Sequence, residues 1–122
     1  MDERLARGVE LFNHQRFFDA HDAWEELWVD LAGPDRLFVQ GLIQAAVGLY
    51  HRGNGNFRGA RSQLSRSLDK LGRFPPGHHG IDTAGLAGEL GGCLAEAERR
   101  CREGRAADPP PPVPVIRRLS TP

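Results

Sequence analysis

The sequence predicts an all-α fold, a compact bundle of about five helices made of two helical hairpins and a C-terminal helix. Apolar residues recur at helical spacing through most of residues 2–102. Glycines and prolines interrupt this pattern at short intervals, as expected for turns between helices. A chain of 122 residues is long enough to bury one hydrophobic core. We therefore expect a single helical domain over residues 1–104 and an extended or disordered proline-rich tail over residues 105–122.

The first two expected helices cover residues 2–14 and 17–31, with a short turn between them. Acidic residues at the start of the first suit the positive end of its dipole. At about 100° per residue, the second helix separates into an apolar and an acidic face. Its apolar face consists of Phe17, Ala20, Trp24, Leu27, Trp28 and Leu31. Its acidic face consists of Asp19, Asp22, Glu26 and Asp30.

The third expected helix, over residues 35–52, is apolar around more than half of its circumference, which predicts a central position in the bundle. Its remaining stripe carries Gln40, Gln44 and His51. Gly41 and Gly48 lie beside this stripe. Because interior glycines weaken a helix, two of them on one stripe indicate that another helix approaches closely there.

The fourth helix is expected from residue 57, after a glycine-rich turn with Asn56 as N-cap. Its exposed faces are basic, with Arg58, Arg66 and Lys70. FPPG at 74–77 ends it, and the following histidine pair, 78–79, is interpreted as loop. The fifth helix is expected over 82–102. In the tail, the sequence leaves open whether the apolar residues Val113, Val115 and Ile116 dock on the bundle.

A faint internal repeat relates the two hairpins at an offset of 40 residues. Gly8 corresponds to Gly48, Phe17 to Phe57, Ala20 to Ala60, and Trp24 to Leu64. Small residues would then lie where the two helices of each hairpin cross. This arrangement is similar to a tetratricopeptide repeat, whose usual period is about 34 residues.

Two polar residues of the second helix, His21 and Glu25, lie inside its apolar arc. They are four residues apart and are able to touch. We expect both to be largely buried and Asp22 and Glu26 to be exposed. If the second and third helices pack antiparallel, the pair converges with the third-helix stripe of Gln40, Gln44 and His51.

Three interpretations of this set follow. The first is an internal hydrogen-bonded network that fixes how the helices dock, in which Gln44→Leu would be destabilising. The second is a small-molecule or metal pocket, with His21, Glu25 and His51 as ligands of a divalent ion such as zinc or iron. The third leaves the two glutamines and His51 facing solvent. No nucleophile motif marks an enzyme.

Charge and composition limit the partners of the protein. The formal net charge is zero, with nine acidic and three basic residues before position 36. The basic run over 52–73 lacks interleaved aromatic residues on its exposed face, so nucleic-acid binding is disfavoured. An acidic protein surface or another copy of the chain is the expected partner. No apolar run approaches the length of a membrane span. Two cysteines without a CxxC pattern and the absence of a secretory signal favour the cytoplasm.

Three motifs in order, FNHQRFFDAHDAWEELW, RLFVQGLIQAAVGLYH and GNFRGA, resemble the prokaryotic family called domain of unknown function 309 (DUF309) over about residues 8–72. The resemblance implies a small, soluble, all-helical protein of tetratricopeptide-like character, and it brings no activity. We predict a binding or scaffolding module that requires no cofactor. The alternative is a metal-dependent enzyme or small-ligand binder that uses His21, Glu25 and His51.

Overall fold

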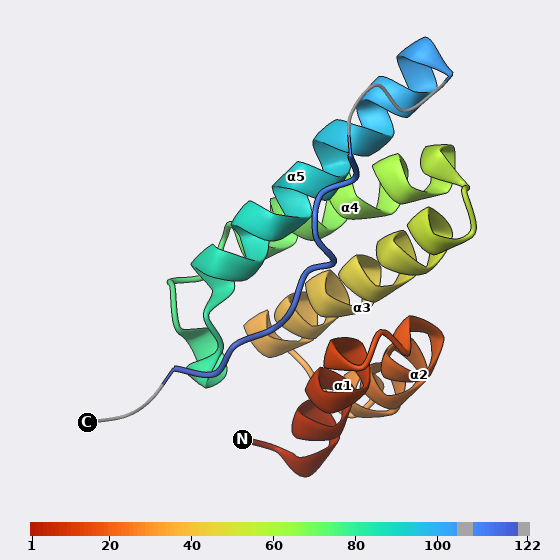
Figure 1. The fold of residues 1–122 in the computed structure, drawn as a ribbon. Coiled ribbons are helices and arrows are strands. Elements are labelled where there is room, and N and C mark those ends of the chain that lie inside the picture. The colour runs from red at the N-terminus through yellow and green to blue at the C-terminus, as the bar shows by residue number, and fades with distance from the viewer. Residues whose placement is uncertain (105–108, 120–122) are drawn as a thin grey trace.

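The computed structural model describes residues 1–104 and 109–119, and it confirms the all-α prediction (Figure 1). Its elements are α1 (Glu3–Asn13), α2 (Phe17–Trp28), α3 (Pro34–Gly53), α4 (Phe57–Leu71), the short 3-10 turn η1 (His78–Gly80) and α5 (Thr83–Glu103). The helices α1 and α2 form one hairpin, α3 and α4 form the second, and α5 packs on α4. None of the helices within the described residues is long and apolar enough to cross a membrane.

Local chemistry sets most of the helix ends. Asp2, Asn56 and Asp82 each cap a helix by accepting a hydrogen bond from a backbone N–H two or three residues ahead. The helix α2 ends at Trp28 rather than at the predicted Leu31. The chain tightens there to shorter-range hydrogen bonds, such as that from the Leu31 N–H to the Trp28 carbonyl at 3.1 Å.

The turns of the two hairpins repeat each other, as the offset of 40 residues predicts. Gln15 and Gly55 both have left-handed backbones, with φ of 61° and 75°. The next residue in each turn donates its N–H back into the preceding helix, from Arg16 to the Leu11 carbonyl at 2.9 Å and from Asn56 to the His51 carbonyl at 2.8 Å. The two turns therefore share a backbone path as well as a residue pattern.

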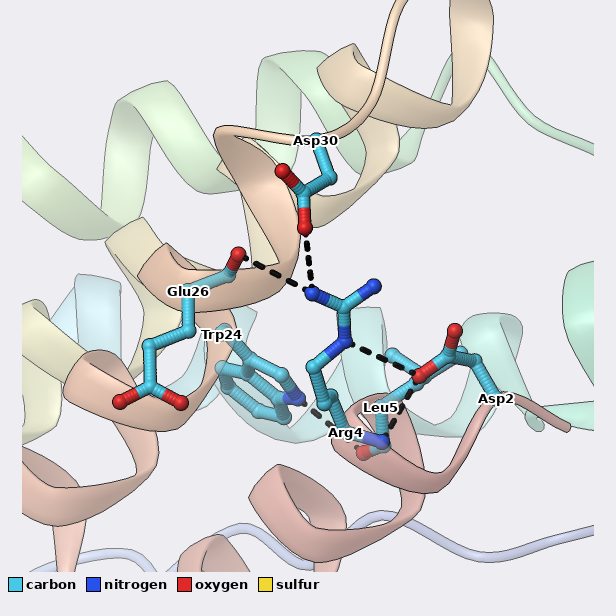
Figure 2. A network of polar contacts seen from close by, with 6 residues as sticks. All are labelled: Asp2, Arg4, Leu5, Trp24, Glu26 and Asp30. Atoms are coloured by element: carbon cyan, nitrogen blue, oxygen red, sulfur yellow. Dashed lines mark hydrogen bonds and ion pairs between the residues drawn. The ribbon is translucent and has the colours of Figure 1, made fainter.

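Each hairpin also closes on a large side chain packed against a glycine. The buried indole of Trp24 lies against Gly8, where a Cβ atom would overlap the ring. A Cβ on Gly48 would lie 2.8 Å from the Leu64 side chain. Figure 2 shows the Trp24 Nε1 donating to the Leu5 carbonyl at 3.2 Å, which satisfies the only polar atom of the indole.

Arg4 joins the start of α1 to the end of α2 at the surface of the first hairpin (Figure 2). Its Nη1 lies 2.7 Å from Asp30 Oδ2 and donates a longer bond of 3.4 Å to the Glu26 carbonyl. Exposed pairs of this kind add little to stability. Burial of apolar side chains in the core contributes more to stability. Phe38, Leu42 and Ala46 of α3 are fully buried, which agrees with the predicted central position of that helix.

The tail residues 109–119 are extended and run back along the bundle from the end of α5 toward η1 (Figure 1). Ile116 is buried, and its backbone N–H and carbonyl both bond the Asn13 side chain, at 2.7 and 2.8 Å. Further on, the Arg117 carbonyl accepts from the Asp82 N–H at 2.8 Å. The tail therefore docks on the bundle, which the sequence had left open. Residues 105–108 and 120–122 of the predicted tail lie outside the described residues.

The glycine contact at the first hairpin gives a direct stability prediction. Gly8→Ala should destabilise the protein by roughly 1–3 kcal/mol, because the new methyl group overpacks the buried indole. Gly88→Ala in α5 is the control, since nothing lies within 4 Å of its Cβ position, and it should stabilise by about 0.5–1 kcal/mol through helix propensity. Urea unfolding followed by circular dichroism measures both. Equal effects of the two substitutions would contradict the packing described for Trp24.

The repeated turn gives a second prediction. Gln15→Gly should stabilise the protein by roughly 1 kcal/mol, because the left-handed φ of 61° is unfavourable for a residue with a Cβ. Gly55→Gln, the reciprocal change at the equivalent turn, should destabilise by a similar amount. Thermal melts of both variants provide the measurement. The two shifts should have opposite signs, and the same sign for both would contradict the equivalence of the turns.

Candidate functional site

A cavity of about 190 Å³ opens between α2 and α3, toward the end of α3. It is lined by Phe17, Phe18, His21, Val47, Tyr50 and His51. At its rim, Phe18 and Tyr50 are 54% and 42% exposed, and their ring centroids are 5.6 Å apart. Two of the predicted site residues, His21 and His51, therefore share one largely apolar cavity with an aromatic rim.

His21 lies partly buried in this cavity, with 21% of its side chain exposed. Its Nε2 lies 3.0 Å from Glu25 Oε1, within ion-pair distance. Its Nδ1 is buried and has no hydrogen-bond partner among the described residues, because the Asp22 carboxylate at 3.3 Å lacks hydrogen-bond geometry. A buried ring nitrogen without a hydrogen-bond partner therefore belongs to one of the residues that line the cavity.

His51 is held by the start of α4. Its Nδ1 lies 3.2 Å from the Asn56 Nδ2, while the Oδ1 of the same asparagine caps α4 at Gly59. Because the amide nitrogen is the donor, His51 Nδ1 accepts and the ring proton belongs on Nε2. A Cβ on Gly59 would lie 2.9 Å from the imidazole, so the glycine makes room for this ring.

The predicted burial of Glu25 is wrong, since 53% of its side chain is exposed. The reason lies in its neighbours on the helix. Phe18 and Val29, the apolar residues on the outer side of Glu25 around the helix, are 54% and 66% exposed. The buried arc of α2 is thus narrower than its apolar arc and excludes Glu25. Asp22 and Glu26 are exposed, as expected.

The predicted convergence of five polar residues does not occur in the described part of the chain. No hydrogen bond there joins Gln40 or Gln44 to His21 or Glu25, and the Gln44 Oε1 is buried without a partner. Gln40 and Gln44 are half-buried, rather than facing solvent or inside a network. The described residues therefore do not form the buried, fully hydrogen-bonded network that was one interpretation of the sequence.

The metal-ligand set predicted from the sequence is also not assembled as expected. Within residues 1–104 and 109–119, His21 and Glu25 group with Asp22, with ligand atoms within 4.8 Å of one another. His51 belongs to no such group, because it is engaged with Asn56 at the start of α4. The remaining group lies on a single helix, with both carboxylates exposed.

A second group that the sequence did not identify joins three residues from distant parts of the chain. The Nε2 atoms of His78 and His79 lie 3.3 and 2.9 Å from Asp35 Oδ1. The hydrogen bond from His79 is the main cause that lowers the pKa of the Asp35 carboxyl. The paired histidines were the only available signal, and their separation from Asp35 by more than 40 residues concealed the partner.

The basic residues of α4 remain apart from both groups. Arg58 and Arg66 are exposed and Lys70 is half-buried. The exposed positions of this helix are otherwise polar, so it offers charge without an apolar anchor.

Comparison with known proteins finds a family match over about the first half of the chain. The family described as Domain of unknown function (DUF309) has a model that matches residues 5–63, which confirms the resemblance drawn from the sequence motifs. The match covers both hairpins up to the middle of α4 and includes the cavity between α2 and α3. Of the group formed by Asp35, His78 and His79, only Asp35 lies inside the matched region, because both histidines follow residue 63. No curated protein matches the chain.

The buried Gln44 Oε1, which has no hydrogen-bond partner, gives a stability prediction. The predicted change in stability is opposite in sign to the loss expected from the sequence. Gln44→Leu should stabilise the protein by about 1 kcal/mol, because it removes a buried acceptor that has no partner and leaves none of its neighbours unpaired. Gln40→Leu is the control, since that half-buried side chain has no unpaired buried atom, and it should change the stability little. Urea unfolding measures both. A clear loss of stability for Gln44→Leu would restore the network interpretation.

Proposed function

We propose that this protein, which matches the DUF309 family model over residues 5–63, is a protein-binding module. Its α2–α3 cavity accepts one apolar side chain of a partner polypeptide that has basic residues beside it. The observation that carries the proposal is the small apolar cavity bordered by the exposed rings of Phe18 and Tyr50. The likeness of the two hairpins to a tetratricopeptide repeat supports it, since helical repeats of this kind present binding surfaces.

The size of the cavity favours a side chain over a cofactor. Pockets for small molecules usually have volumes of about 300–1,000 Å³. The α2–α3 cavity, at about 190 Å³, is smaller than this range. Its walls are mainly aromatic and aliphatic, so the complementary group is one apolar or aromatic side chain.

The exposed aromatic rings support a protein partner. Phe18 and Tyr50 are large side chains in mutual contact that keep 54% and 42% of their surface in water. Aromatic residues are enriched at protein interfaces, where they supply most of the binding energy from a few positions. Covering this pair would remove apolar area from water without any rearrangement of the helices.

Charge supports a basic partner. Around α2, two acidic residues already have arginine partners: Asp19 pairs with Arg16, and Asp30 pairs with Arg4 of α1. The exposed carboxylates of Asp22, Glu25 and Glu26 have no arginine or lysine partner among the described residues. Asp22 and Glu25 approach the cavity through their contacts with His21, whereas Glu26 lines a separate hollow that also contains Arg7 and Arg16. Exposed carboxylates beside the cavity attract lysine or arginine and repel acidic segments. The basic face of α4 in a second copy supplies the charge but lacks the apolar anchor, which favours a different polypeptide over a homo-oligomer.

A cytoplasmic location, expected from the sequence, belongs to this proposal. Both cysteines, Cys93 and Cys101, are free thiols, the form that reducing compartments maintain.

Two peptide libraries test the proposal. Each fixes one leucine or aromatic anchor, flanked by lysine and arginine in one library and by aspartate and glutamate in the other. We expect binders only in the basic library, and their affinity should fall as salt rises. Phe18→Ser and Tyr50→Ser should each weaken binding by about tenfold or more, as measured by fluorescence anisotropy.

Val29→Ser is the matched control, because Val29 is an exposed apolar residue at the end of α2 that does not line the cavity. It should leave binding unchanged, and circular dichroism should show all three variants folded. Equal enrichment in both libraries, or an equal loss of affinity in Val29→Ser, would refute the proposed site. Sedimentation at low and high salt, with dimers that dissociate as salt rises, would instead indicate self-association through charged surfaces.

A further inference from the structure

We propose that Asp35, His78 and His79 form a binding site for a divalent transition-metal ion such as Zn²⁺ or Fe²⁺, with an open coordination position beside a neighbouring cavity. This site shares no residue with the α2–α3 cavity of the proposed function. Asp35 lies in the first turn of α3, and both histidines belong to η1.

The spacing of the three ligand atoms suits a metal. Zinc binds imidazole nitrogen and carboxylate oxygen at about 2.0–2.2 Å, which places ligand atoms about 3.0–3.5 Å from one another around one ion. The two histidine Nε2 atoms lie 3.3 and 2.9 Å from Asp35 Oδ1, and all three atoms lie within 4.8 Å of one another. An ion would replace the present N–H···O contacts, with the ring protons moved to Nδ1.

The donor set suits a transition metal rather than calcium or magnesium. Imidazole nitrogen favours zinc, iron, copper and nickel, whereas hard cations take oxygen ligands. Two imidazoles and one carboxylate are the ligands of both catalytic zinc centres and non-haem iron centres, which leave positions for water or substrate.

The backbone of η1 is arranged so that two adjacent side chains point to the same atom. Neighbouring residues in regular structure diverge by about 100° in a helix and by about 180° in a strand. His79 avoids this divergence through a left-handed backbone, with φ of 54° and ψ of 27°. Such a conformation is uncommon in residues other than glycine, and strained residues of this kind cluster at functional sites. Gly77 and Gly80, with φ of 86° and 74°, form the bends on either side.

Aromatic packing and the tail hold this turn. The buried ring of Phe38 packs edge-on against His78 at 4.7 Å between centroids, and Phe74 lies 4.8 Å from the same imidazole. The Leu119 N–H bonds the Gly80 carbonyl at 2.8 Å, so the docked tail secures the end of η1. Ligands held in this way need little reorganisation to bind an ion.

The neighbouring cavity has a volume of about 220 Å³. It is lined by Asp2, Leu5, Leu27, Leu31, Asp35, Val39 and His79. Two of the three proposed ligands thus border a partly enclosed space with a mainly apolar wall. An ion held at this wall would have an open position next to the cavity, with room for water as a further ligand, unlike a closed structural metal site.

The group of His21, Asp22 and Glu25 provides the internal comparison. Its ligand atoms also lie within 4.8 Å of one another. Its members lie on one helix, however, and both of its carboxylates are more than half exposed. It lacks the left-handed ligand residue of the Asp35 group, and the ring against its histidine, that of Phe18 at 5.6 Å between centroids, is 54% exposed, whereas Phe38 beside His78 is buried. We therefore expect the metal at Asp35, His78 and His79.

Metal titrations of the full chain, freed of any purification tag, test the site. Zn²⁺ competed against a chromophoric chelator should bind at one equivalent with a dissociation constant in the micromolar range or below, and Co²⁺ should give visible absorption bands. His79→Gly removes the imidazole while keeping a left-handed backbone without strain, so this variant should fold and bind Zn²⁺ at least tenfold more weakly. Asp35→Asn and His78→Gln should weaken binding similarly.

His21→Ala and His14→Ala are the controls, and both should bind Zn²⁺ like the unmodified chain. Zn²⁺ should raise the melting temperature of the unmodified chain and of both controls, but not that of His79→Gly. The proposal would be overturned if one equivalent of Zn²⁺ does not bind below about 100 µM. Binding that persists in His79→Gly or is lost in His21→Ala would overturn it as well. Peptide binding at the α2–α3 cavity should be the same with and without a chelator. Failure of the metal site and failure of the proposed function can therefore be told apart.

Discussion

The packing of the Trp24 indole on the bare backbone of Gly8 is the contact on which the rest of the structure depends. It lets α1 and α2 approach closely, and the bond from the indole to the Leu5 carbonyl fixes their relative position. The second hairpin repeats this arrangement with Leu64 against Gly48. Because α3 packs between α2 and α4, the two closures together set the positions of both cavities. A methyl group at either glycine would therefore disturb packing far beyond its own contacts.

The central helix α3 connects the two proposed sites. Asp35 lies in its first turn, whereas Tyr50 and His51 lie in its last turns, next to the α2–α3 cavity. At about 1.5 Å per residue, the fifteen residues from Asp35 to Tyr50 separate the sites by roughly 22 Å along the axis. The two sites therefore share a rigid element without sharing any residue. One end offers nitrogen and oxygen ligands to a small cation, and the other offers an aromatic surface to a side chain.

The docked tail joins parts of the fold that the helices alone leave apart. The Asn13 side chain holds Ile116 against the first hairpin, while Arg117 and Leu119 bond the backbone around η1. The tail thus links the end of α1 to the turn that carries the histidine pair. This contact gives the proline-rich segment a structural role, because its extended backbone finds hydrogen-bond partners on several elements of the bundle.

Periodicity in the sequence was sufficient for the helices and for the repeated hairpins, since side chains three and four residues apart share a face wherever a helix forms. It could not show which border of the α2 apolar arc is covered, because burial depends on neighbouring helices, and Phe18 and Glu25 proved exposed. It also could not pair Asp35 with His78 and His79, because that contact spans more than 40 residues. Local pattern therefore determined the secondary structure of this protein. Its exposed aromatic pair, its histidine cluster and its docked tail were decided by tertiary contacts between segments that no local pattern relates.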